Sequence, residues 1–113
     1  MDERGLRIGR NEIVFREVNE RLREIGEGFS LVSEFAEFVC ECGDSACTER
    51  IQLALADYER VRSDPKWFVI VPGHEELEYE RIVDQPEGYT IVEKLGGGPA
   101  GMAIRDDPRA DQR

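Results

Sequence analysis

The first third of the chain alternates apolar and polar positions with the period of an α-helix. Apolar side chains recur at intervals of four, four and three residues, at Val14, Val18, Leu22 and Ile25. This spacing places them in one stripe along a helix. Asn11 is a favourable N-cap residue, and two glycines that follow the stripe are typical of a helix end. We therefore predict a helix over residues 12–26 with one apolar stripe.

The middle of the chain changes between the periods of strands and helices. Apolar alternation or short apolar runs predict four strands, over residues 35–41, 49–53, 66–71 and 88–95. A spacing of three predicts a helix over residues 55–64, which Pro65 ends. The stretch YERIVD at 79–84 fits either a strand or a helix. This order predicts an α+β fold, in which a small, mainly antiparallel sheet carries an N-terminal and a central helix.

The two ends of the chain lack such patterning. Residues 1–10 are charged and are expected to form a polar leader. The stretch GGGPAG interrupts regular structure, and few apolar side chains follow it. We therefore expect residues 96–113 to be a Gly-rich linker and a flexible polar tail. A single domain over residues 11–95 agrees with the length of the chain.

All three cysteines fall within the eight residues CECGDSAC. Cys40 and Cys42 point to the same side of an extended strand, because side chains alternate with period two. Gly43 allows a sharp turn, and the turn-forming residues after it carry Cys47 back toward the other two. Thiolates bind zinc, which structural sites hold with four tetrahedral ligands. The spacing predicts three zinc ligands at the tip of a β-hairpin made by the first two strands.

The fourth ligand must come from another part of the chain. The only histidine, His74, follows the most apolar strand, and Pro72 and Gly73 before it form a turn that fixes the imidazole. We predict a zinc site made of Cys40, Cys42, Cys47 and His74. The alternative is that His74 is an ordinary turn residue and that the shell is completed by water, Glu41, Asp44 or Glu75.

The motif C-x-C-G-x3-C resembles the post-SET zinc segment of protein-lysine methyltransferases, where three closely spaced cysteines share zinc with one distant ligand. The match covers eight of 113 residues. It implies this ligand arrangement and does not imply methyltransferase activity. The stretches FVCECG, YERVR, PGHE and VEK also resemble a family of small uncharacterised actinobacterial proteins with a C-x-C-x4-C…H zinc pattern. That resemblance implies no known activity.

Charge and hydropathy limit the partners that we expect. Acidic residues outnumber basic ones by 25 to 15, a formal net charge of −10. Phosphate groups are bound through clustered Lys and Arg, so neither nucleic acid nor an anionic membrane is an expected partner. No apolar run approaches the ~20 residues that span a bilayer, and the charged N-terminus lacks a signal-peptide pattern. We expect a cytoplasmic protein whose cysteines stay reduced.

These observations favour a structural role for the metal. No nucleophile–base pair is recognisable, and three thiolates make zinc a weak Lewis acid. We expect a non-enzymatic bacterial domain that acts in regulation through a protein partner and that is unfolded or molten without zinc. Two alternatives use the same site: a thiol-based redox or metal sensor, and a zinc-dependent hydrolase or deaminase built on HEE at 74–76. Free thiols packed in a core are a further interpretation of the cysteines. The oligomeric state stays open.

Overall fold

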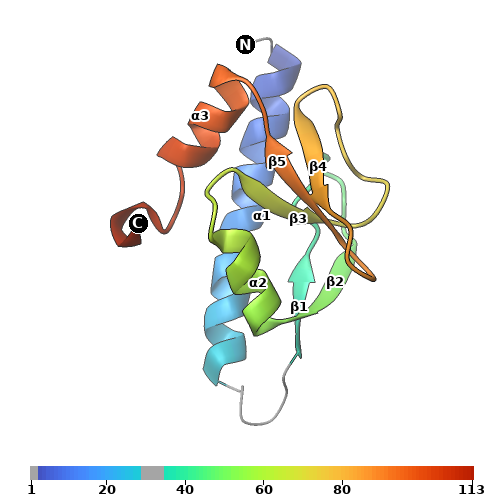
Figure 1. Ribbon diagram of the computed structural model, residues 1–113, viewed down its shortest axis with the longest axis vertical. Coiled ribbons are helices and arrows are strands. Elements are labelled where there is room, and N and C mark those ends of the chain that lie inside the picture. Colours follow the sequence, from blue (N-terminus) through green and yellow to red (C-terminus); the bar gives the residue numbers. More distant parts are fainter. Residues whose placement is uncertain (1–2, 29–34) are drawn as a thin grey trace.

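A long helix runs along the molecule, and the two other α-helices and the strands gather beside it (Figure 1). The computed structural model describes residues 3–28 and 35–113. Its elements are α1 (Glu3–Gly28), β1 (Phe35–Val39), β2 (Arg50–Ala54), α2 (Leu55–Arg62), β3 (Trp67–Ile70), β4 (Glu80–Asp84), β5 (Thr90–Lys94), α3 (Gly97–Arg105) and a 3₁₀ turn (Ala110–Gln112). The predicted α+β class, with an N-terminal and a central helix, is confirmed. No helix of the described residues has both the length and the apolar character needed to cross a membrane.

The strands form two separate antiparallel sheets in place of the one predicted. β1 and β2 pair as a hairpin, with Phe38 opposite Ile51, and the cysteine-containing segment connects them. The second sheet has the order β3-β5-β4, so β5 lies at its centre. The stretch 79–84, which the sequence left undecided, contains strand β4.

Glu41 connects the two sheets. Its backbone N–H donates to the carbonyl oxygen of Val69 at 2.8 Å, and its carboxylate accepts the N–H of Val69 at 3.0 Å. The side-chain amide of Asn19 on α1 donates to the same carboxylate and to the carbonyl oxygen of Val39, each at 2.8 Å. Glu41 is completely buried. It therefore fixes where the hairpin meets β3.

The apolar stripe predicted on the first helix is largely exposed, and of its four members Leu22 alone packs against the core. Val14, Val18 and Ile25 are 58%, 40% and 59% exposed. The inward face of α1 instead carries buried polar side chains, namely Glu12, Arg16, Asn19 and Glu20. The helix also begins at Glu3, so most of the predicted polar leader is helical. Apolar periodicity located the helix but not its buried face, because ion pairs and hydrogen bonds replace apolar contacts there.

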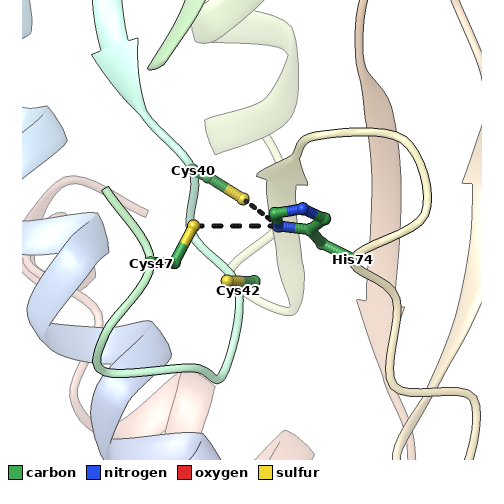
Figure 2. A group of neighbouring side chains, drawn as sticks. All are labelled: Cys40, Cys42, Cys47 and His74. Carbon is green, nitrogen blue, oxygen red and sulfur yellow. Dashed lines mark hydrogen bonds between the residues drawn. The ribbon is translucent and has the colours of Figure 1, made fainter. Parts of the chain in front are cut away.

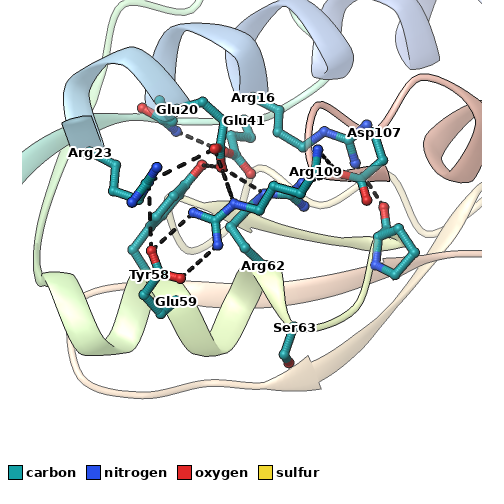
Figure 3. A network of polar contacts seen from close by, with 12 residues as sticks. Arg16, Glu20, Arg23, Glu41, Tyr58, Glu59, Arg62, Ser63, Asp107 and Arg109 are labelled. Carbon is teal, nitrogen blue, oxygen red and sulfur yellow. Dashed lines mark hydrogen bonds and ion pairs between the residues drawn. The ribbon is translucent and has the colours of Figure 1, made fainter. Parts of the chain in front are cut away.

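Two buried networks of charged side chains supply those contacts. In the first, the ammonium group of Lys94 lies 2.7 Å from the carboxylate of Glu12 and 3.0 Å from that of Glu80. The second network centres on Arg62, which pairs with Glu20 at 3.0 Å and also with Asp107 (Figure 3). Both networks join α1 to residues more than 40 positions further along the chain.

The C-terminal segment is a packed helix and turn, which contradicts the linker predicted from its glycines. Met102 and Ala103 of α3 are buried, and the Met102 sulfur lies so close to α1 that a Cβ at Gly9 would stand 2.9 Å from it. After α3, Arg109 donates to the carboxylates of Glu20 and Glu59 (Figure 3). The prediction from composition is wrong because charged side chains such as Arg109 form ion pairs that exist only in the folded chain.

Candidate metal centre

The cysteine segment, residues 40–47, leaves β1, turns, and returns into β2. Its turn follows the predicted turn chemistry: the Asp44 carboxylate accepts the N–H of Ala46 at 2.9 Å, and the N–H of Cys47 donates to the Asp44 carbonyl oxygen at 3.0 Å. This Asx turn is what carries Cys47 back toward the first two cysteines. The prediction that a tight turn joins the ligands is confirmed.

Gly43 has a role that differs from the one predicted. Its φ is not in the left-handed region, so conformational freedom is not what the position requires. A Cβ atom there would collide with the side chain of Ile8 on α1, while the Asn11 amide donates to the Gly43 carbonyl oxygen at 2.9 Å. The absence of a side chain therefore lets the cysteine segment pack directly against α1.

His74 is held by a second turn, at the end of β3. Its backbone N–H donates to the carbonyl oxygen of Val71 at 3.0 Å, and Gly73 before it has a φ of +94°, which favours glycine. The same strand end reaches the cysteine segment, since the N–H of Val71 donates to the Cys40 sulfur at 3.2 Å. The turn thus delivers the imidazole to the three sulfurs (Figure 2).

The four predicted ligands lie together. One potential ligand atom from each of Cys40, Cys42, Cys47 and His74 lies within 4.8 Å of all the others. His74 Nδ1 is 3.5 Å from the Cys40 sulfur and 3.7 Å from the Cys47 sulfur. Tetrahedral zinc, with bonds of about 2.3 Å to sulfur and about 2.0 Å to nitrogen, separates two such ligands by about 3.6 Å. The two distances from His74 Nδ1 therefore match edges of a zinc tetrahedron, and the remaining pairs of ligand atoms lie within 4.8 Å of each other.

The thiols are poised to exchange protons for a cation. The hydrogen bond with Cys40 lowers the pKa of Cys42 to about 5, and the backbone N–H of Asp44 also favours the thiolate. That shared hydrogen bond, followed by burial, raises the pKa of Cys40, and burial raises the pKa of Cys47. One thiolate among three sulfurs is thus favoured at neutral pH, because further negative charge is repelled. A metal ion bound by these sulfurs would remove that repulsion and displace the remaining protons.

Glu49 is a functional residue that the sequence reasoning missed. Its carboxylate lies 2.9 Å from Nε2 of His74, the ring nitrogen that faces away from the sulfurs. A carboxylate in this place keeps the ring proton on Nε2 and leaves Nδ1 free to bind a metal, as second-shell partners of metal-bound histidines do. The sequence did contain one indication of this role. Glu49 follows Cys47 by two residues, which puts both side chains on one side of an extended segment.

The alternative fourth ligands are engaged elsewhere. Glu41 binds Val69 and Asn19, Asp44 closes the turn, and Glu75 accepts the N–H of Gly73 at 3.1 Å. Within the described residues, none of these carboxylates belongs to the metal-ligating group. The ligand set predicted from the sequence is therefore the one that the fold brings together.

A small cavity of about 230 Å³ opens beside the centre. It is lined by Cys42, Gly43, Asp44, Gly73, His74, Glu75 and Glu76. Its volume is below the roughly 300–1,000 Å³ of typical ligand pockets. Its carboxylates make the approach to the centre negative, which favours entry of a cation. The geometry thus describes a candidate metal centre with an acidic entrance.

No family model matches the chain, and neither a curated protein nor a solved structure matches it.

Proposed function

We propose that the protein is a small, non-enzymatic zinc-binding domain whose site of three cysteines and one histidine has a structural role. The spacing of His74 Nδ1 from the sulfurs of Cys40 and Cys47, 3.5 and 3.7 Å, is the observation that carries this proposal. Thiolate and imidazole donors in a tetrahedral arrangement suit zinc better than magnesium or calcium, which bind oxygen ligands.

The position of the site supports a structural role. The cysteines belong to the hairpin of β1 and β2, whereas His74 follows β3 in the other sheet. A metal held by all four would join the two sheets beside Glu41, which already bridges them through Val69. Structural zinc sites have four protein ligands, and catalytic sites keep one position open for water.

Non-enzymatic function follows from the same arrangement. His74, the only histidine, is used as a ligand, and its second nitrogen faces Glu49. Four protein ligands leave no open position for a substrate, and the adjacent cavity is small. We therefore assign the protein a regulatory role through contact with a protein partner in the cytoplasm, and its net charge of −10 favours a basic partner surface over nucleic acid.

Metal analysis combined with thermal unfolding tests this proposal. The purified protein should contain one zinc ion per chain, and a strong chelator should abolish its cooperative unfolding transition or lower its midpoint by more than about 10 °C. His74→Ala should lose zinc under competition from a chromogenic chelator that leaves the wild type loaded. A cooperative transition unchanged by metal removal would contradict the structural role, and full zinc retention by His74→Ala would remove that residue from the site.

A thiol-based sensor is a second candidate, favoured by the partial exposure of Cys47 and by three reduced thiols in one cluster. Peroxide would oxidise two thiolates to a disulfide, itself being reduced to water, and the zinc ion would leave with its ligands lost. Stoichiometric peroxide should then release zinc within minutes. Addition of a thiol reductant should restore zinc binding. Zinc retention under a large excess of peroxide would exclude the sensor and leave the structural assignment unaffected.

A further inference from the structure

The first turns of α1 contact both loops that carry the candidate ligands. Arg4, Ile8 and Asn11 follow one another at spacings of four and three, so they lie on one face of the helix. Ile8 and Asn11 meet the cysteine segment at Gly43. Arg4 meets the loop after β3, which carries His74. A stretch of helix about 10 Å long therefore connects the two loops.

On the side of the cysteine segment, the contacts of α1 are buried and closely packed. Ile8 is buried, and a Cβ atom at Gly43 would stand 2.4 Å from its side chain. The amide of Asn11 donates to the carbonyl oxygen of Gly43 at 2.9 Å. The next residue, Glu12, forms a buried ion pair with Lys94 at 2.7 Å. This side of the centre is therefore firmly attached to α1.

On the side of His74, the contacts of α1 are exposed. The guanidinium of Arg4 lies 3.1 Å from the carboxylate of Glu76 and 2.5 Å from that of Glu78. It also lies 5.5 Å from the centre of the Tyr79 ring. The side chains of Arg4, Glu76 and Glu78 are 48%, 35% and 63% exposed. Exposed ion pairs are weak and are screened by salt, so this side opens more readily than the other.

Opening on this side would reach the candidate ligands directly. The cavity beside the centre is lined by one stretch from each loop, residues 42–44 and residues 73–76. Movement of the second stretch away from α1 would widen the cavity and withdraw His74 from the sulfurs. Structural zinc sites use four ligands, so this withdrawal would leave a position that a competing ligand can occupy.

We propose that Arg4 positions the loop that carries His74 and thereby controls how fast the centre exchanges its metal. This inference rests on the proposed zinc site. In the closed form, Arg4 holds Glu76 and Glu78, and the imidazole stays with the three sulfurs. In the open form these contacts part, His74 leaves the ion, and the ion passes to a competing ligand. Arg4 binds no metal and acts through the loop alone.

The charge of Arg4 by itself predicts the opposite effect on release. Removal of a cation near a site that holds Zn²⁺ makes the surroundings more negative, which should retain the ion more firmly. Removal of the contacts with Glu76 and Glu78 should instead free His74 and speed release. The direction of the change therefore separates a positioning role from a purely electrostatic one.

The rate at which the zinc-loaded protein releases its ion to an excess of chromogenic chelator tests the proposal. Arg4→Gln should raise this rate by about three- to tenfold, and Arg4→Lys, which keeps the charge, should raise it less. Arg7→Gln makes the same charge change at an exposed position of α1 that forms no ion pair among the described residues. It should change the rate by less than about twofold.

Salt and hydrogen exchange show which contacts and which side are involved. Between about 0.05 and 0.5 M salt, the rates of the wild type and Arg4→Gln should converge, because salt weakens the contacts of Arg4. In the zinc-loaded protein, Arg4→Gln should speed hydrogen exchange in residues 72–79 and leave residues 40–47 unchanged. Faster exchange in both segments alike would overturn the proposal, since it would show a general loss of stability.

The release rates also separate failure of this inference from failure of the proposed function. Equal or slower release by Arg4→Gln in a protein that does hold zinc would overturn the role of Arg4 and leave the zinc site standing. A wild type that holds no zinc would overturn the zinc site and, with it, the role of Arg4. Faster release by Arg4→Gln but not by Arg7→Gln is the result that we expect.

Discussion

Glu49 and His74 are joined by a contact of 2.9 Å between a carboxylate oxygen and the Nε2 atom of the ring. Glu49 directly precedes β2 and His74 lies in the turn after β3, so the contact links the two sheets. It orients the ring so that Nδ1 faces the sulfurs of Cys40 and Cys47. Glu49 is not itself one of the candidate ligands, but it therefore helps to set the affinity of the site for a metal.

Glu49→Ala should lower zinc affinity by about 10–100-fold, as the loss of a second-shell carboxylate typically does. Glu49→Gln should lower it less, because its amide oxygen still accepts the Nε2 proton. Competition with a chromogenic chelator measures both affinities. Glu37→Gln makes the same charge change at an exposed position of the hairpin and should leave the affinity unchanged. Equal affinities in all four proteins would show that Glu49 does not position His74.

Gly43→Ala should destabilise the protein by about 1–3 kcal/mol, because its methyl group would overlap the side chain of Ile8. Urea denaturation of the zinc-loaded protein measures the loss in free energy of unfolding. A matched control is Gly101→Ala, since a Cβ at Gly101 on α3 meets no atom within 4 Å. Ile8→Ala should partly rescue Gly43→Ala, so that the double variant is more stable than additivity predicts. Strict additivity would contradict the packing explanation.

Asp107→Asn should cost about 3 kcal/mol or more of unfolding free energy. The carboxylate of Asp107 pairs with the completely buried Arg62 and with Arg113, and its loss leaves the buried guanidinium of Arg62 with Glu20 as its remaining charged partner. Its neighbour Asp106 is exposed, and among the described residues its carboxylate forms an ion pair only with Arg105, so Asp106→Asn should change stability by less than about 1 kcal/mol. Chemical denaturation of the two variants compares adjacent carboxylates directly, and equal effects would refute the importance of burial.

The contribution of Glu12 to stability should fall as the pH rises above the pKa of the unfolded chain, near 4.5. Burial raises the pKa of Glu12 well above its usual range, despite the opposing attraction of Lys94. The folded protein therefore keeps a proton that the unfolded chain releases near pH 4.5, and stability contributed by that proton is lost as the pH rises through the folded value. Glu12→Gln removes this titration and retains the pair of Lys94 and Glu80.

Thermal melts of the wild type and Glu12→Gln from pH 5 to pH 9 measure this effect. The variant should gain on the wild type with increasing pH, by about 4 °C for each kcal/mol of ionisation cost that it avoids. The difference between the two melting temperatures should be smallest at pH 5. A difference that does not change with pH would show that Glu12 is ionised throughout, stabilised by Lys94.

The candidate metal ligands could be predicted because their chemistry is rare in this chain. Three cysteines and one histidine are present among 113 residues, and a zinc site of this kind uses all of them. Turn residues around Asp44 and Gly73 also showed where the backbone reverses. The role of Glu49 was harder to predict, because the chain has 25 acidic residues and the sequence does not distinguish the one that meets His74.

The inward face of α1 could not be predicted from apolar periodicity. Arg16 can be buried because its guanidinium donates hydrogen bonds to the carbonyl oxygens of Pro65 and Ala103. These acceptors are distant in sequence. The same reason applies to the C-terminal segment, where Arg109 binds Glu20 and Glu59. Periodicity assumes that burial follows hydrophobicity, and this fold satisfies buried polar groups through long-range pairs instead.

The order of the ligands along the chain has a consequence for folding. Cys40, Cys42 and Cys47 are close enough in sequence for an unfolded chain to hold zinc by three thiolates, whereas His74 joins them only when the hairpin meets the end of β3. Metal bound to the unfolded state reduces the stabilisation that binding provides. A bound ion would therefore favour the native state chiefly through its fourth ligand, as a reversible cross-link that closes the chain between residues 47 and 74.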